Sequence, residues 1–234
     1  MRHLLTVKKN SKTKAGIRSN KRGILLVDDH PLFRKGMIQL LGQEPDIEVC
    51  AEANSSHAAL DAIRRQKFDL AIVDVGLGGG TDGIELTKII KAEQPELPIL
   101  VVSMHDEALY AERALRAGAR GYVMKREALD SILNAVQSVL SGEIYVSSSM
   151  TKRMLFNHLQ AGGEARSAVD RLTDRELEIF QLIGEGRDMH EIARQLHLSK
   201  KTVEAHRANI KEKLNLPSAR EVVRQAAQWV STQS

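Results

Sequence analysis

The feature that most constrains the fold is a buried apolar strand that stops at a carboxylate and runs directly into glycines. Residues 70–73 are apolar, Asp74 follows, and the chain continues as VGLGGGTDG to Gly83. An apolar run of this kind predicts a strand buried on both faces, as in parallel sheets covered by helices. Asp74 then stands at the carboxyl end of the strand, where open α/β sheets bind ligands. Its position therefore favours chemistry over packing.

Apolar strands and amphipathic helices alternate from residue 23 to about residue 140. Strands of an α/β fold that are separated by helices favour parallel pairing with right-handed crossovers. We therefore expect residues 23–141 to form a doubly wound five-stranded parallel sheet. The strands are expected at residues 24–27, 47–51, 70–75, 98–103 and 121–124, with helices at 31–41, 56–65, 84–92, 108–117 and 128–140.

The rest of the chain contains helical patterns only. Residues 142–171 are interpreted as a linker with a short helix at about 150–159, and residues 172–234 as a second, small all-α domain. Thr173 and Glu176 stand at capping-box spacing, and Ser199 is placed to cap another helix. The helices are expected at residues 174–185, 189–196, 200–214 and 219–231.

Charge is distributed unevenly along the 234 residues. Residues 1–22 hold eight Lys or Arg and no acid, which indicates a disordered extension, either a basic arm for DNA or a solvated tail. Residues 23–145 hold 12 basic and 19 acidic side chains, whereas residues 146–234 hold 14 and 11. This contrast favours cation chemistry in the first domain and a polyanionic partner for the second.

Neither a membrane span nor a disulfide is indicated by the sequence. No apolar run reaches the roughly 18–20 residues needed to cross a bilayer, and the first 22 residues lack a secretory apolar core. We therefore expect a soluble, cytoplasmic protein. Cys50 is the single cysteine and lies in an apolar-rich stretch, so it is interpreted as a small core residue.

The carboxyl ends of four expected strands bring charged and polar side chains to one edge of the sheet. They are Asp28 and Asp29, Asp74, Ser103 and Lys125. Three neighbouring carboxylates repel one another unless a cation lies among them, and Mg²⁺ prefers carboxylate oxygens, water and phosphate. A lysine and a hydroxyl beside that ion suit a phosphoryl group during transfer to a carboxylate. Asp74 is the natural nucleophile of such a site.

The motifs ILLVDDH, IVDVGL, LVVSM and GYVMK closely resemble the receiver domain of bacterial two-component response regulators. The resemblance covers residues 23 to about 140. It implies that Asp74 accepts a phosphoryl group from a sensor histidine kinase. It also implies that Asp29 and Asp74, with the Gly76 carbonyl and supported by Asp28, ligate Mg²⁺.

The same resemblance assigns the residues that sense phosphorylation. It implies that Lys125 contacts the phosphoryl group, that Ser103 turns toward it, and that Tyr122 changes rotamer in concert. Phosphorylation adds nearly two negative charges and three acceptor oxygens, so these contacts arise only in that state. The chain departs from the family after the acceptor, where Gly78 replaces a common proline and Gly83 comes one residue late. Arg126 replaces another common proline after the lysine.

A phosphatase of the haloacid-dehalogenase type is the alternative from another class. Such an enzyme also combines an Asp nucleophile with Mg²⁺ and a lysine, but it carries an acid or base two residues after the nucleophile. Gly76 occupies that position here. Turnover is then expected to be slow, so storage of the phosphoryl group is favoured over hydrolysis, and we do not expect an enzyme beyond slow autodephosphorylation.

The third expected helix of the second domain, residues 200–214, has an apolar and a polar side. Val203, Ile210 and Leu214 form the inner stripe. With the preceding helix and a short turn, it makes a helix-turn-helix whose second helix suits the major groove. A charged stripe alone is more typical of a solvated helix. Basic and polar side chains crowd its first turn, namely Lys200, Lys201 and Thr202.

The stretches LTDRELEIFQLIGEG and EIARQLHLSKKTVEAHRANIKEKL closely resemble the LuxR-type DNA-binding domain of NarL/FixJ-class regulators, over residues 172–230. The resemblance implies contacts to the DNA backbone from Lys201, Thr202, His206 and Lys211. It implies that Glu204, Ala205, Arg207 and Ala208 face base edges. It also makes the last helix a dimer contact through Val222, Val223 and Ala226.

Together these features predict a transcription regulator that is switched by phosphorylation and binds double-stranded DNA as a dimer. A third class remains open, a regulator that acts without phosphorylation or binds only protein. The intact set of acidic residues at the sheet edge weakens that alternative.

Overall fold

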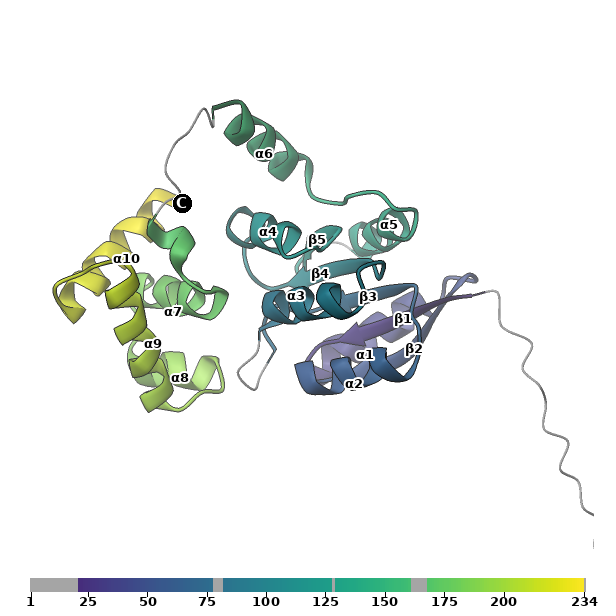
Figure 1. Ribbon diagram of the computed structural model, residues 1–234, viewed down its shortest axis with the longest axis horizontal. Helices are drawn as coiled ribbons and strands as arrows, with labels where there is room; N and C mark the ends of the chain where they lie inside the picture. The colour runs from purple at the N-terminus through teal and green to yellow at the C-terminus, as the bar shows by residue number, and fades with distance from the viewer. Residues whose placement is uncertain (1–20, 78–81, 128, 161–167, 234) are drawn as a thin grey trace, which may run out of the picture.

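The computed structural model describes residues 21–77, 82–127, 129–160 and 168–233. The expected basic extension, residues 1–22, lies outside these residues except for Lys21 and Arg22. Two parts follow one another along the chain, an α/β domain and a helical domain joined by one further helix (Figure 1).

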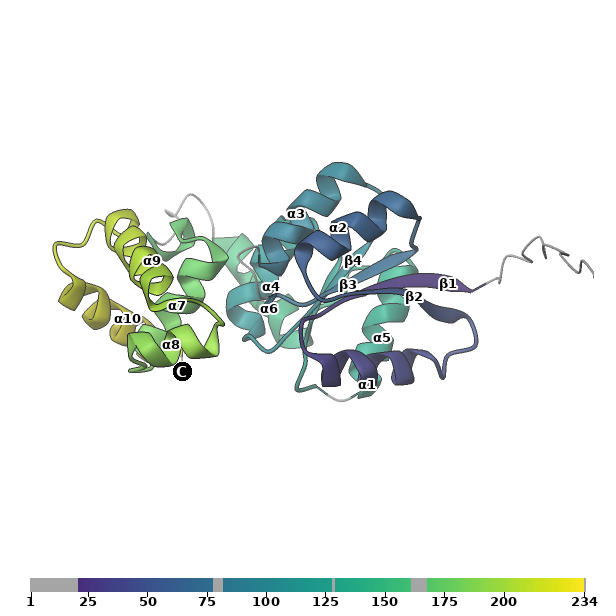
Figure 2. The same ribbon diagram turned by 90° about the horizontal axis from the view of Figure 1, so that it is seen from below.

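The first part is a five-stranded parallel sheet with strand order β2-β1-β3-β4-β5. Helices α2, α3 and α4 pack with one apolar cluster on one face, and α1 and α5 with another on the other face (Figure 2). The predicted doubly wound α/β class is therefore confirmed. The strands are β1 Arg22–Val27, β2 Ile47–Ala53, β3 Leu70–Val73, β4 Ile99–Ser103 and β5 Gly121–Met124. The helices are α1 Pro31–Leu41, α2 Ser56–Arg65, α3 Gly83–Glu93, α4 Glu107–Arg116 and α5 Leu129–Leu140.

The predicted strand at residues 70–75 ends two residues early, at Val73. The chain turns beyond Asp74, because the Leu77 N–H donates back to the Val75 carbonyl at 2.9 Å. Asp74 itself stays aligned with the sheet, since its N–H donates to the Val27 carbonyl at 2.9 Å. The Asp74 carboxylate therefore lies at the point where regular pairing gives way to a loop.

The interpretation of Cys50 as a core residue is wrong, because Cys50 is exposed. It lies on β2, which is an edge strand. Residues on one side of this strand are buried or half-buried, whereas Cys50 shares the opposite side with Glu48 and Glu52. The alternation of side chains along a strand thus places this apolar thiol on the solvent side.

A helix between the two domains and four further α-helices complete the chain. Thr173 and Glu176 form the predicted capping box, and the Ser199 hydroxyl accepts the Thr202 N–H at 3.0 Å. The elements are α6 Ser148–Gln160, a 3₁₀ turn Ala168–Arg171, α7 Asp174–Gly184, α8 Met189–Gln195, α9 Lys200–Lys213 and α10 Ala219–Gln233. No helix among the described residues is long and apolar enough to cross a membrane.

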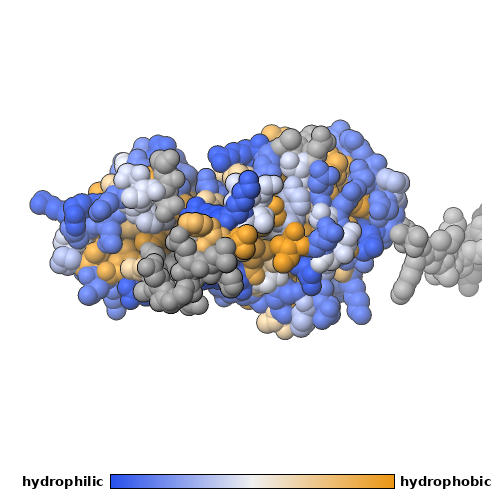
Figure 3. Space-filling view, turned by 90° about the horizontal axis from the view of Figure 1, so that it is seen from above, coloured by the Kyte–Doolittle hydropathy of each residue, from blue (hydrophilic) through white to orange (hydrophobic). Residues whose placement is uncertain are grey.

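The face that carries α6 is mostly hydrophilic, with apolar surface gathered near its middle (Figure 3). Leu155 and Phe156 of α6 are each 59% exposed. The same helix is held to the first domain at its start, where buried Met150 joins the apolar cluster that contains Tyr110. One side of α6 is thus packed and the other is open.

The assignment of Val222 and Ala226 to a dimer face is wrong, because both are fully buried within the domain. The Ala226 backbone lies so close to Gly184 of α7 that a Cβ on Gly184 would come within 2.5 Å of the Ala226 carbonyl oxygen. Only Val223 of the three is exposed, at 46%. The apolar stripe of α10 therefore belongs mainly to the core of its own domain.

Gly83, the first residue of α3, packs directly on the backbone that carries Asp74. A Cβ on Gly83 would lie 1.9 Å from the Asp74 carbonyl oxygen, which no side-chain adjustment relieves. We expect Gly83→Ala to lower the free energy of unfolding by about 3 kcal/mol or more, as overpacking against fixed backbone does. Urea denaturation of the variant measures this loss.

Gly36→Ala is the matched control for that substitution. Gly36 lies in α1, and a Cβ there meets nothing within 4 Å. Since alanine is the better helix former, this change should stabilise the protein by about 0.5–1 kcal/mol. Equal effects of the two substitutions would contradict the close approach of α3 to Asp74.

Candidate functional site

Carboxylates from two adjacent strands meet at the carboxyl edge of the sheet. Asp28 and Asp29 follow β1, and Asp74 follows β3. Asp28 is 1% exposed and Asp74 is 3% exposed. Ligand atoms of these three residues and of His30 all lie within 4.8 Å of one another. The structure thus brings the predicted acidic residues together, and their hard oxygen atoms fit the ligand preference of Mg²⁺.

Lys125 lies between the two buried carboxylates. Its Nζ is 2.6 Å from Asp74 Oδ2 and 2.7 Å from Asp28 Oδ2. The same ammonium lies 4.5 Å from the centre of the Phe33 ring, a cation–π contact from α1. One buried cation therefore offsets the repulsion between two buried anions.

Burial raises the pKa of the Asp74 carboxyl, and neighbouring Asp28 raises it further, while Lys125 and the Gly76 N–H oppose the shift. That N–H donates to Asp74 Oδ1 at 3.2 Å. The two Asp74 oxygens thus have different partners, Gly76 for Oδ1 and Lys125 for Oδ2. The Asp74 carboxylate is therefore held in one orientation from both sides.

His30 was missed in the sequence, although it directly follows the Asp pair. Its Nδ1 lies 2.7 Å from Asp29 Oδ1, 3.4 Å from Asp28 Oδ1 and 3.7 Å from Asp74 Oδ2. The ring is largely exposed, so it forms the outer wall of the acidic group. A histidine immediately after two aspartates was the available signal.

Ser103 and Tyr122 converge on one residue, His105. The His105 N–H donates to Ser103 Oγ at 3.1 Å, and the Tyr122 hydroxyl donates to the His105 carbonyl at 2.9 Å. Tyr122 is buried, and burial raises the pKa of its hydroxyl. The two residues predicted to sense a phosphoryl group are therefore linked through the backbone of His105.

The predicted DNA-binding residues lie on the outer side of α9. Val203, Ile210 and Leu214 are buried on the inner side, as predicted. Thr202 is also part of the helix cap, since its hydroxyl lies 2.7 Å from Ser199 Oγ. Of the predicted contact residues, Thr202, His206 and Arg207 are half-buried, and the exposed ones are Lys200, Lys201, Glu204, Ala205, Ala208 and Lys211.

Two family models match the chain, one for each domain. The model described as "Response regulator receiver domain" matches residues 24–137, and the model described as "Bacterial regulatory proteins, luxR family" matches residues 170–226. The Fimbriae Z protein of Salmonella typhimurium is 38% identical over 200 residues, 86% of this chain and 93% of that protein. The chain is a response regulator of the NarL/FixJ class.

Further relatives agree with this membership. The oxygen regulatory protein NreC of Staphylococcus carnosus is 35% identical over 207 residues, covering 87% of the response regulator and 95% of NreC. A solved structure of RcsB from Salmonella enterica serovar Typhimurium, bound to a promoter with the phosphomimetic BeF3⁻, has a TM-score of 0.57 and 26% identity. That alignment covers 89% of this chain and 99% of RcsB.

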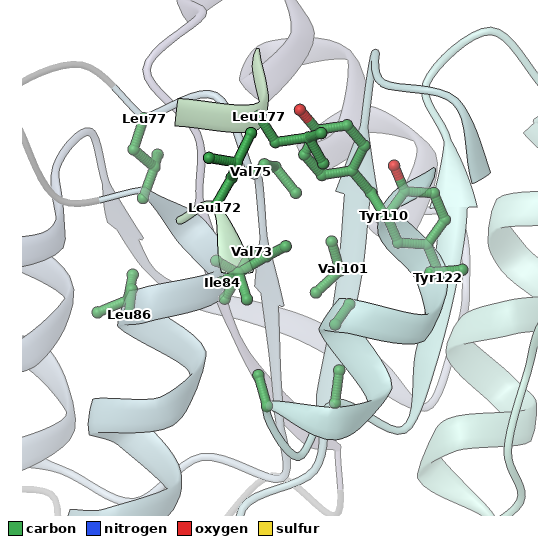
Figure 4. Packing of buried hydrophobic residues seen from close by; sticks show 14 of the residues in the cluster. Val73, Val75, Leu77, Ile84, Leu86, Val101, Tyr110, Tyr122, Leu172 and Leu177 are labelled. Atoms are coloured by element: carbon green, nitrogen blue, oxygen red, sulfur yellow. The ribbon is translucent and has the colours of Figure 1, made fainter. Parts of the chain in front are cut away.

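The two domains of this response regulator touch at the carboxyl edge of the sheet, near the acidic residues. Leu172 and Leu177 of the second domain share an apolar cluster with Val75 and Tyr110 of the first (Figure 4). The His105 ring stacks on Tyr110, and its Nε2 lies 3.2 Å from Glu178 Oε1 of α7. These interdomain contacts were not predictable from motifs, because they depend on how two separate surfaces meet.

Removing the Lys125 cation should destabilise the response regulator when no metal is present. Lys125→Met leaves Asp28 and Asp74 without their counter-charge, and breaking a buried pair costs about 3–5 kcal/mol. We expect the free energy of unfolding in a chelating buffer to fall by about 3–5 kcal/mol. Millimolar Mg²⁺ should stabilise the variant more than the wild type.

Urea denaturation with and without Mg²⁺ measures both effects. Lys67→Met is the control, because Lys67 is an exposed lysine of the same domain. Stability losses of the same size in the two variants would be evidence against the ion-pair role of Lys125.

Proposed function

We propose that the response regulator is switched by phosphoryl transfer from a sensor histidine kinase to Asp74. The observation that carries this proposal is the position of Asp74, a buried carboxylate in contact with Lys125 at the carboxyl edge of the sheet. Its Oδ attacks phosphorus while the P–N bond of the donor phosphohistidine breaks. Lys125 then holds the oxygens of the transferred group.

The acidic residues would hold Mg²⁺, with Asp28, Asp29 and Asp74 supplying carboxylate oxygens and Gly76 its carbonyl. Their oxygen donors and close spacing support this assignment. The metal would neutralise charge on the phosphoryl oxygens during transfer. Lys125, held against both buried carboxylates, contributes a second cation to the same task.

Ser103 and Tyr122 are proposed to report the phosphoryl group. If Ser103 Oγ turns to a phosphoryl oxygen, it gives up the N–H of His105, which then loses one of the contacts that fix its backbone. Tyr122 is hydrogen-bonded to the same residue and responds with it. This places the change next to the contact between His105 and Glu178.

Storage of the phosphoryl group is favoured over a phosphatase reaction. Gly76 stands two residues after Asp74, where a dehalogenase-type phosphatase carries an acid or base. A glycine cannot activate the leaving group or water, so slow autodephosphorylation is the expected fate. Sustained release of phosphate from a small phosphomonoester would favour the enzyme instead.

The second domain is proposed to bind double-stranded DNA in the cytoplasm, with α9 in the major groove and two copies on paired half-sites. Exposed Lys201 and Lys211 on α9 support contacts to phosphates. A relative supports dimeric binding, since one solved structure is described as two RcsB dimers bound to two parallel DNAs. The limits of the two domains, at residues 141 and 172, are part of this proposal. Residues 1–22 are either a basic arm for DNA or a solvated tail.

Asp74→Asn tests the acceptor assignment. Since the amide oxygen is a poor nucleophile, labelling by a small phosphodonor in the presence of Mg²⁺ should fall to background. Intact-mass measurement follows the added phosphoryl group, and Asp61→Asn, on the surface of α2, is the control. Equal labelling of the Asp74→Asn variant and the wild type would exclude Asp74 as the acceptor. Unchanged DNA binding and transcriptional output in that variant would favour a regulator that acts without phosphorylation.

Lys201→Ala and Lys211→Ala test the DNA surface. Each variant should bind a mixed-sequence duplex more weakly, and the slope of log K against log salt should become shallower by about 0.9 per lost phosphate contact. Fluorescence anisotropy over a salt series measures both quantities. Lys35→Ala removes an exposed lysine from α1 of the first domain and should leave the slope unchanged. An unaltered slope in both α9 variants would show that α9 does not dock as proposed.

A further inference from the structure

The second domain closes the space in front of the proposed acceptor. A cavity of about 190 Å³ separates the domains, with Asp74 and His30 on one side. Leu196 and His197, from the turn of the helix-turn-helix, lie on the other side together with Arg175 of α7. Pockets that take drug-sized molecules measure about 300–1,000 Å³, so this space suits a smaller molecule.

The turn is fixed over the cavity by a chain of polar contacts. Arg175 donates to the Leu196 carbonyl at 2.9 Å and pairs with Glu178 at 2.5 Å. Glu178 in turn meets His105 of the first domain at 3.2 Å. Burial raises the pKa of the Glu178 carboxyl, but His105 and Arg175 outweigh burial and hold that pKa below its usual range. The contact to the first domain is therefore made by a charged carboxylate.

A second clamp lies outside the cavity. Arg113 of α4 donates to the Leu172 carbonyl at 2.8 Å, to the Val169 carbonyl at 3.1 Å and to Asp174 at 3.0 Å. The Arg113 side chain is mostly buried, so these bonds are shielded from water. These three hydrogen bonds from the Arg113 guanidinium fix the docked position of the second domain. Arg113 does not line the cavity in front of Asp74.

The docked arrangement covers the acceptor more than it covers DNA-binding residues. Three of the four residues predicted to face base edges, Glu204, Ala205 and Ala208, are exposed in this structure, and Arg207 is half-buried. His206 is the predicted contact that faces the receiver domain, in a separate cavity shared with Arg113. What docking restricts most directly is therefore access to Asp74.

We propose that the docked second domain selects the phosphodonor by size. Small phosphoramidates reach Asp74 in the docked form, whereas a histidine carried on a protein reaches it only after the domains separate. The proposal rests on Asp74 being the acceptor, as argued above. A donor that needs a minor, separated form reacts at a rate scaled by the population of that form.

In phosphoryl transfer from phosphoramidate to Asp74, the bond that forms is matched by the bond that breaks. An Asp74 oxygen attacks the phosphorus of phosphoramidate, a new P–O bond forms, and the P–N bond breaks. The electron pair of that bond leaves with nitrogen, which departs as ammonia with the protons it already carries. No oxidant, reductant or further reactant is required.

Three donors with the same P–N bond and increasing bulk test the proposal on the full-length chain with Mg²⁺. They are phosphoramidate, monophosphoimidazole and a short peptide phosphorylated on histidine. For each donor, intact-mass measurement gives the ratio of the rate in Arg113→Gln to the rate in wild type. This ratio cancels the intrinsic reactivity of the donor. Arg113→Gln removes the clamp while leaving the acceptor cavity untouched.

The ratio should stay near one for phosphoramidate. For the phosphopeptide it should approach about ten, as expected when the separated form is about 10% of the wild-type population and dominates in the variant. Glu178→Gln should likewise raise the ratio for the phosphopeptide above that for phosphoramidate, because it weakens the contact to His105. Glu221→Gln is the matched control, because Glu221 pairs with Arg224 on the surface of α10 in the same domain. Fluorescence of Trp229, which packs near Phe180, reports that each variant is folded.

The outcomes separate this proposal from the one on which it rests. Ratios that are equal for all three donors in both interface variants would overturn selection by size. Persistent labelling of Asp74→Asn would instead overturn the acceptor assignment. If Glu178→Gln does not fold, Arg113→Gln alone tests selection by size, because that substitution lies on the receiver domain.

Discussion

The interaction on which the site depends is the pairing of one buried lysine with two buried carboxylates. Lys125 follows β5, and Asp74 follows β3, with β4 between them. Strands lie about 4.8 Å apart, so the side chain must bridge about 10 Å between strand ends. Only a long, flexible cation achieves this, and Nζ reaches Asp74 at 2.6 Å. The strand order and the length of the lysine thus place the positive charge at the carboxylates and leave Ser103 on the strand between.

His105 makes two kinds of contact, one through its backbone and one through its ring. Its backbone holds Ser103 and Tyr122 at 3.1 and 2.9 Å, and its ring meets Glu178 of the second domain at 3.2 Å. A displacement of this backbone therefore changes an interdomain contact without any intermediate element. Stacking on buried Tyr110 keeps the ring oriented toward α7, so the coupling is short and direct.

The residues at the sheet edge were predictable because parallel strands deliver their carboxyl ends to one place. Each of four apolar runs is followed by one of these residues, so the sequence predicted that they share one edge of the sheet. They are Asp28, Asp74, Ser103 and Lys125. The contacts between domains were not predictable, since they depend on two surfaces that only the folded chain brings together.

The partner of an apolar helix face was also ambiguous in the sequence. The apolar side of α10 suits a dimer equally well, and the Val222 side chain shows that it packs inside the domain.

Electrostatic repulsion couples phosphorylation to docking, and this repulsion gives the switch its direction. A phosphoryl group on Asp74 would enter the cavity that Leu196 and His197 close. It would also bring nearly two negative charges toward Glu178, which is ionised and faces the same space. This repulsion favours the separated form. Linkage requires the converse, so a ligand that binds only the separated form shifts the phosphorylation equilibrium by the same factor.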